Sequence, residues 1–112
     1  MHTCNVALYG CGTVGAGVAE ILLGRRGALR RRLGPGIQLR YIVDLRLEQV
    51  RSQIQPPDTV TLTDEIRQPL SDPDVDVVVE LFGGTGAAKK VVENALRAGK
   101  DVVTANKALL AA

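Results

Sequence analysis

Short apolar runs alternate with segments of helical period along the whole chain, and this alternation is the feature that most restricts its fold. A strand, a helix and a second strand in succession form a parallel sheet with a right-handed crossover. The run "VDVVVEL", residues 75–81, is almost continuously β-branched, as is typical of a strand covered on both faces. The sequence therefore predicts an α/β fold with a doubly wound parallel sheet.

The individual elements follow from the same pattern and from the glycines and prolines that interrupt it. Strands are predicted at residues 5–9, 37–43, 59–62, 75–81 and 101–104. Helices are predicted from the first glycines to residue 23, at residues 28–33, 45–54, 64–70 and 87–98, and from Asn106 onward. Gly24 is expected to end the first of these helices, and Gly99 to form the left-handed cap after the helix at residues 87–98.

Composition sets the outer limits of function. The 112 residues suit one domain, residues 1–112, and the formal net charge of +2 favours neither nucleic acid nor a membrane surface as partner. Cys4 and Cys11 are too few and too far apart for a zinc site or a CxxC redox pair. Nothing resembles a signal peptide or an apolar span of about 18 residues. We expect no metal site and a cytoplasmic location.

Three glycines lie at the first strand-to-helix junction, in "NVALYGCGTVGAGVAEIL". Gly10, Gly12 and Gly15 have the GxGxxG spacing and the context of the dinucleotide fingerprint of the Rossmann fold. The first glycine would permit the sharp turn, the second would admit a pyrophosphate to the backbone, and the third would let helix and strand pack closely. The amides of Thr13 and Val14 would face the phosphates. A turn that needs glycine for packing alone gives the same pattern.

An acid is expected at the end of the second strand, and Asp44 occupies that place. It stands 29 residues after Gly15, and the extra helical piece at residues 28–33 accounts for the added length. Its carboxylate could accept hydrogen bonds from adenosine ribose hydroxyls, which favours NAD, whereas Arg46 could pair with a 2′-phosphate, which favours NADP. A solvent-exposed Asp–Arg pair at a strand end is the alternative.

A second strand is followed by glycines and a helix in "VVVELFGGTGAAKK". All strands of an open parallel sheet end at one crevice, so Gly83 and Gly84 are expected near the same cofactor, toward its nicotinamide. A purely structural turn is again the alternative.

The segment "VVTANKALLAA" contains a lysine at a position where it is not expected to stabilise the fold. Lys107 follows Asn106, a good N-cap, and so lies in the first turn of a helix, where the helix dipole disfavours a cation. An anionic substrate or phosphate would offset that repulsion, and the dipole should lower the lysine pKa. The alternative is an exposed lysine that reaches solvent at a cost of about a few tenths of a kcal/mol.

Three segments, "GCGTVGAGV", "VVELFGG" and "ALRAGKDVVTANKALLA", resemble in order and spacing the N-terminal cofactor-binding domain of homoserine dehydrogenase. The resemblance covers essentially the whole chain and is densest at residues 6–18 and 78–111. It implies the interconversion of L-homoserine and L-aspartate 4-semialdehyde with NAD or NADP, in the aspartate pathway to threonine and methionine. By motif, it assigns the pyrophosphate to Gly10, Gly12, Thr13, Val14 and Gly15, and the nicotinamide and substrate end to Thr104, Asn106 and Lys107. Lys107 is its one catalytic candidate.

The same resemblance implies a longer enzyme, a homodimer with a separate substrate and dimerisation domain that supplies the proton donor. We therefore expect residues 1–112 to be an incomplete cofactor-binding domain that binds dinucleotide weakly and does not turn over homoserine. Val43 stands where many NADP-using members have an arginine, which leaves the cofactor preference open. Two other interpretations remain: a non-catalytic nucleotide- or CoA-binding sensor module, and another aspartate-pathway reductase.

Overall fold

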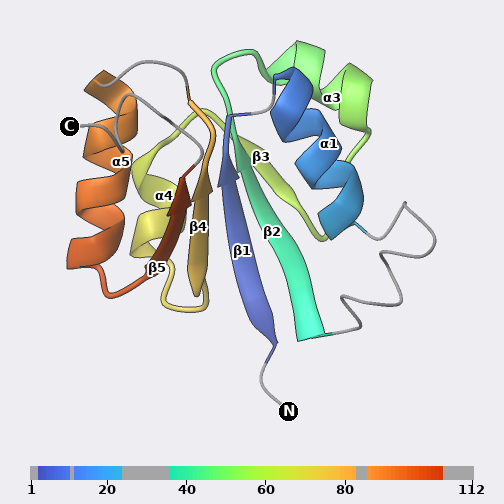
Figure 1. Ribbon diagram of the computed structural model, residues 1–112. Coiled ribbons are helices and arrows are strands. Elements are labelled where there is room, and N and C mark those ends of the chain that lie inside the picture. Colours follow the sequence, from blue (N-terminus) through green and yellow to red (C-terminus); the bar gives the residue numbers. More distant parts are fainter. Residues whose placement is uncertain (1–2, 11, 24–35, 83–85, 105–112) are drawn as a thin grey trace.

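The computed structural model describes residues 3–10, 12–23, 36–82 and 86–104. Its strands form one parallel sheet in the order β3-β2-β1-β4-β5 (Figure 1). The bounds are β1 Cys4–Tyr9, β2 Ile37–Val43, β3 Thr61–Thr63, β4 Val77–Glu80 and β5 Asp101–Thr104. The chain begins in the centre, moves outward to β3, and returns to the other side of β1 for β4 and β5. This order is that of a Rossmann-type half and confirms the predicted fold class.

Helices cover both faces of the sheet, as Figure 1 shows. They are α1 Thr13–Leu22 and α3 Leu47–Ile54 on one face, and α4 Arg67–Ser71 and α5 Gly86–Arg97 on the other. Because side chains alternate along a strand, β1 serves both faces. Val6 and Leu8 pack in a core cluster with Val50 of α3, while Ala7 and Tyr9 pack in a second cluster with Val91 of α5. The sheet is thus doubly wound around two apolar layers.

The last residues of the strands stand in one row across the sheet. Strand pairing sets them in the order Thr63, Val43, Tyr9, Glu80 and Thr104. The backbone ladder continues beyond this row, because the Gly10 amide donates to the Val43 carbonyl at 2.8 Å. Everything that follows a strand therefore starts at one edge of the sheet, which we call the carboxyl edge.

Several predicted boundaries are displaced, and each displacement has a local cause. Residues 45–46 do not start α3, because the Asp44 carboxylate accepts a hydrogen bond from the Arg46 amide and holds them in a turn. The Thr63 hydroxyl accepts from the Glu65 amide in the same way and delays α4. A turn in which the Val60 amide donates to Pro57 shifts the start of β3 to Thr61.

The predicted cap at Gly99 is confirmed. Its φ is +78°, its amide donates to Leu96, and the Lys100 amide donates to Ala95, which is the Schellman pattern at the end of α5. The predicted Gly24 helix end, the helical piece at 28–33 and the helix from Asn106 lie outside the described residues. Among the described residues, no helix has the length and apolar character needed to cross a bilayer.

Candidate functional site

The junction between β1 and α1 needs glycine at its first position for two reasons. Gly10 has a φ of +94°, a left-handed conformation that L side chains rarely adopt. A Cβ atom at this position would also lie 3.0 Å from the Phe82 ring and 3.1 Å from the Leu81 carbonyl carbon. The turn after β1 is therefore held tightly against the turn after β4.

Gly12 differs from Gly10, because it is exposed and has an ordinary φ of −77°. A Cβ atom there would meet the Arg46 Nη2 atom at 3.9 Å, which is an ordinary contact. The residue is the N-cap of α1, and no side chain caps the helix. Packing within the described chain therefore does not account for a glycine at this position, whereas the approach of a ligand to the backbone does.

The first turn of α1 offers backbone donors next to this open position. Helix geometry leaves the amides of Thr13, Val14 and Gly15 without a carbonyl partner inside α1, and the Ala16 amide is the first to donate back, to Gly12 at 2.8 Å. Gly15 itself is buried at the base of the helix. These three amides, which have no partner within the helix, and the positive end of the helix dipole together favour the binding of an anion.

Two adjoining hollows lie along the carboxyl edge. The first, of about 420 Å³, is lined by Gly10, Gly12, Asp44, Leu45, Arg46, Leu81 and Phe82. The second, of about 260 Å³ and mostly apolar, shares three of these residues and is completed by Val43, Asp64, Ile66 and Ala87. An elongated ligand with an anionic middle and a flat apolar end would suit this shape.

Asp44 and Arg46 meet at the boundary of the two hollows. The Asp44 Oδ1 atom accepts from the Arg46 amide at 2.8 Å and from its Nε atom at 3.3 Å. Asp44 is only 5% exposed, whereas the Arg46 side chain is 59% exposed. The alternative of an exposed Asp–Arg pair is therefore wrong for the carboxylate, which is turned into the protein, while the guanidinium faces the hollow beside Gly12.

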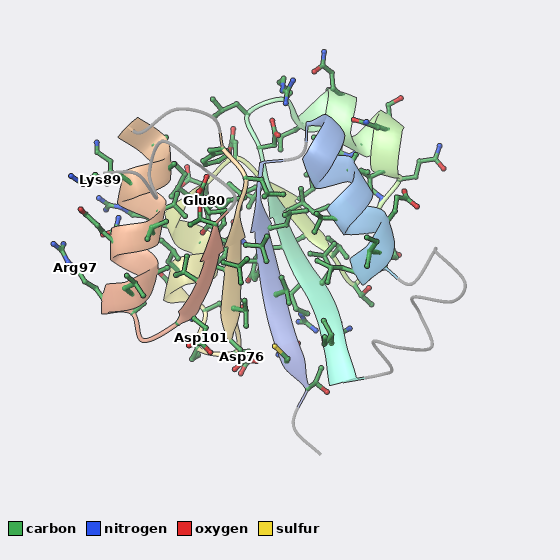
Figure 2. The ribbon with its side chains drawn as sticks, in the orientation of Figure 1. Asp76, Glu80, Lys89, Arg97 and Asp101 are labelled. Carbon is green, nitrogen blue, oxygen red and sulfur yellow. The ribbon has the colours of Figure 1, made fainter. Side chains whose placement is uncertain are left out.

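At the other end of the row, Thr104 lies next to a residue that the sequence analysis missed. The Thr104 hydroxyl donates to the Glu80 Oε2 atom at 2.6 Å, and the Phe82 amide donates to Glu80 Oε1 at 2.6 Å. Glu80 has no exposed surface and ends β4 inside the layer toward α5 (Figure 2). An acid within an otherwise apolar, β-branched run was the signal available in the sequence.

Tyr9 was also missed. Its hydroxyl donates to the Ile66 carbonyl at 2.6 Å, and its ring meets the Phe82 ring edge-on with centroids 6.0 Å apart. Burial, and secondarily the neighbouring Tyr41, raise the pKa of Tyr9 far above its ordinary value, so this phenol stays neutral. Tyr9 thus supports the floor of the second hollow.

Four predicted site residues lie outside the described part of the chain: Gly83, Gly84, Asn106 and Lys107. In sequence, the first two follow Phe82 and the last two come two and three residues after Thr104. Within the described ranges, no three His, Cys, Asp or Glu side chains gather as a metal site would require.

Comparison with known proteins identifies the family. The family profile described as "Homoserine dehydrogenase, NAD binding domain" matches residues 10–112. The chain belongs to this family. It is 45% identical over 111 residues to the homoserine dehydrogenase of Neisseria gonorrhoeae and 39% identical to that of Bacillus subtilis, in each case over 99% of this chain and 25% of the relative.

A solved relative shows the same fold. The crystal structure of a homoserine dehydrogenase from Thiobacillus denitrificans matches with a TM-score of 0.84 and 37% identity, over 99% of this chain and 25% of that one. The chain thus spans about a quarter of the length of the homoserine dehydrogenases it matches. The part of the family that it matches is the NAD-binding domain.

Proposed function

We propose that the chain is the dinucleotide-binding part of a homoserine dehydrogenase, which interconverts L-homoserine and L-aspartate 4-semialdehyde. In the reductive direction, a bound nicotinamide cofactor would supply the hydride that the carbonyl carbon of the semialdehyde gains, and the carbonyl oxygen would gain a proton. The observation that carries this proposal is the exposed, side-chain-free position at Gly12 beside the first-turn amides of α1, which have no carbonyl partner within the helix. Family membership supplies the reaction.

In this proposal, the diphosphate lies over Gly10, Gly12 and Gly15, with the Thr13 and Val14 amides donating to its oxygens. Gly10 shapes the turn, and Gly12 leaves the space. The helix dipole of α1 adds attraction for the anion, and the Arg46 guanidinium stands close enough to Gly12 to add its charge.

The adenosine end extends over Asp44 and Arg46 into the mostly apolar second hollow. Asp44 is proposed to bind the ribose hydroxyls through its carboxylate, and Arg46 to accommodate a 2′-phosphate when the cofactor is NADP. We therefore propose that both NAD and NADP are accepted. The preference between them depends on how readily the guanidinium leaves Asp44.

The nicotinamide end lies toward the ends of β4 and β5. Gly83 and Gly84 are proposed to border it, with Thr104, Asn106 and Lys107 on the substrate side. Lys107 is proposed as the catalytic residue of this chain, whose ammonium polarises the reacting oxygen. The sequence position of the lysine in a first helical turn and the family resemblance support this role.

The remaining parts of the proposal concern the whole enzyme. A substrate and dimerisation domain, absent from residues 1–112, completes the site in a homodimer, so this chain alone binds cofactor without turnover. A cytoplasmic location suits the free thiol of Cys4, since reducing compartments keep thiols unpaired.

The test is a titration of the chain with NADH and NADPH, each followed by cofactor fluorescence, together with an assay for homoserine oxidation. We expect binding of both cofactors and no oxidation. Asp44→Ala should weaken both by about ten-fold or more, as expected for a lost hydrogen bond to a charged group. Unchanged affinities would refute the ribose assignment, and robust oxidation of homoserine would refute the need for a second domain.

Lys107 is tested in a full-length enzyme that contains this chain. Lys107→Ala should lower kcat by about a hundred-fold or more, in the range found when one group that stabilises developing charge is removed. A non-catalytic sensor module predicts no such dependence, so an unaffected rate would favour that alternative.

A further inference from the structure

Glu80 is a fully buried carboxyl group in a row of residues that otherwise needs no acid. It has 0% exposure, and both of its oxygens are engaged, one by the Phe82 amide and one by the Thr104 hydroxyl, each at 2.6 Å. Burial of a carboxylate is costly, and donors at each oxygen offset that cost. The hydrophobic layer toward α5 would be served better by a valine or leucine, so packing does not explain Glu80.

What Glu80 does is join the ends of two neighbouring strands. Its Oε1 contact fixes the backbone of Phe82, which directly precedes Gly83 and Gly84 in the sequence. Its Oε2 contact fixes Thr104, the last residue of β5, three positions before Lys107. The last described residues before the two segments that the sequence assigns to the nicotinamide end are therefore both held by one side chain.

The Phe82 contact also reaches the diphosphate turn. The Phe82 ring packs edge-on against Tyr9 and stands where a Cβ on Gly10 would meet it at 3.0 Å. A shift of the Phe82 backbone would therefore also displace the end of β1. Interior packing is dense enough to transmit such a shift rather than absorb it.

We propose that Glu80 is a positioning residue for the nicotinamide end of the site: it acts through Thr104 and Phe82 and touches neither cofactor nor substrate. The proposal rests on the proposed dinucleotide function. It states that the hydrogen bond between Thr104 and Glu80 fixes the ends of β4 and β5 relative to one another, and hence the fit of the nicotinamide ring beside these strand ends.

The experiment compares two ligands on this chain, NADH and ADP-ribose. They share the adenosine, the diphosphate and the second ribose, and differ in the nicotinamide. The ratio of the two dissociation constants therefore isolates the part of the site that Glu80 is proposed to position. Dissociation constants are measured calorimetrically for the wild type, Glu80→Gln, Thr104→Val, Thr104→Ser and the double variant Glu80→Gln/Thr104→Val.

We expect Thr104→Val to weaken NADH by about five-fold, the usual effect of one lost hydrogen bond, and to change ADP-ribose by less than about two-fold. Thr104→Ser keeps the hydroxyl and should restore the wild-type ratio. The double variant should lose no more than the larger single loss, because residues that act through one contact are not additive.

Thr63→Val is the matched control. Thr63 ends β3 in the same row, and its hydroxyl accepts from the Glu65 amide at 3.0 Å, on the side away from Glu80. Its loss should lower the melting temperature, which is recorded for every variant, without changing the ratio of NADH to ADP-ribose affinity.

Three results would overturn the proposal: equal losses for both ligands in Thr104→Val, independent losses in the double variant, or a wild type that binds NADH no better than ADP-ribose. A wild-type chain that binds neither ligand would instead refute the proposed function itself. Should Glu80→Gln not fold, Thr104→Val and Thr104→Ser still decide between the outcomes.

Discussion

The two edges of the sheet differ in how their polar groups are bonded. At the carboxyl edge, the turn after β1 leaves first-turn amides of α1 without helical partners, Gly12 is exposed, and the Arg46 guanidinium faces a hollow. At the amino edge, the connection from α4 to β4, which we call the 72–76 loop, is held by side chains from β1, from β2 and from the residue directly before β5. The carboxyl edge presents backbone donors and an exposed guanidinium, whereas the polar groups of the amino edge are bonded to one another.

The ties on the 72–76 loop come from residues far away in the sequence. Asn5 donates to Asp74 and Asp76, Tyr41 donates to Asp72, and Lys100 donates to the carbonyls of Asp72 and Val75. Figure 2 shows Asp76 and Asp101 together at this edge, where the Asp101 amide donates to Asp76 at 3.0 Å. Burial, followed by these two carboxylates, raises the pKa of the Cys4 thiol. The difference predicts that the amino edge contributes more to stability, whereas cofactor binding is proposed for the carboxyl edge.

The largest expected effect is on stability, from Lys100→Met. Lys100 is 7% exposed, and its Nζ atom donates at 2.8 Å to both carbonyls named above. Methionine keeps the length of the side chain and leaves those carbonyls without this donor, so the free energy of unfolding should fall by about 2–3 kcal/mol. Urea unfolding followed by circular dichroism measures this, and the dissociation constant for NADH should stay unchanged.

Lys90→Met is the control for this variant, because Lys90 is exposed on α5 and should contribute within about 0.5 kcal/mol. Altered NADH affinity in folded Lys100→Met would show that the two edges are coupled, and the division between them would fail.

Gly12→Ala at the carboxyl edge should have the opposite effect, with a larger change in cofactor affinity than in stability. The φ of −77° suits alanine and the nearest described contact is ordinary, so stability should fall by no more than about 1 kcal/mol. The added methyl group occupies the space proposed for the diphosphate, and NADH affinity should fall by about ten-fold or more, since the backbone approach is lost. The titration described above measures this loss.

Gly17→Ala is the matched glycine control within the same helix. Apart from its chain neighbours and the backbone of its own helix, no described atom lies within 4 Å of a Cβ at Gly17, and alanine in a helix interior should stabilise the chain by about 0.5–1 kcal/mol. Its NADH affinity should remain that of the wild type. Equal affinities for Gly12→Ala and the wild type would place the diphosphate elsewhere.

The sequence was sufficient for the features that depend on local rules. The β-branched runs and the glycines after them predicted a doubly wound parallel sheet, which the structure confirms with the strand order β3-β2-β1-β4-β5. Gly99 could be assigned to a left-handed cap because few other residues adopt that conformation. Asp44 could be placed at the end of the second strand because the end of that strand can be located from the local sequence pattern.

Features that depend on contacts between distant residues could not be predicted. The link of Glu80 to Thr104 spans 24 positions, and the ties from Asn5 to the 72–76 loop span about 70. Hydrogen bonds inside turns, such as that from Arg46 to Asp44, compete with helix formation and displaced the predicted boundaries. Such bonds are decided by tertiary geometry, which period and composition do not encode.

The smallest expected effect tests the amino edge through pH. The hydrogen bond from the Tyr41 hydroxyl, at 2.7 Å, and then that from the Asp74 amide hold the pKa of Asp72 below its ordinary value of 3.8, while the same Tyr41–Asp72 bond raises the pKa of Tyr41 above 10.0. A carboxyl with a lowered folded pKa stabilises the protein above its unfolded value and loses this contribution as the pH falls through the folded value. A phenol with a raised pKa stabilises the protein below its unfolded pKa and loses this contribution as the pH rises through the folded pKa.

Tyr41→Phe should therefore lower the free energy of unfolding by about 0.5–1 kcal/mol between roughly pH 4 and pH 10. The effect is small because the two groups are largely solvated, and the difference from the wild type should shrink on both sides of that window. Urea midpoints measured from pH 2.5 to 10.5 would show it. A difference that stayed constant over the whole range would mean that Tyr41 stabilises the loop by packing alone, and the hydrogen-bonded character of this edge would have to be given up.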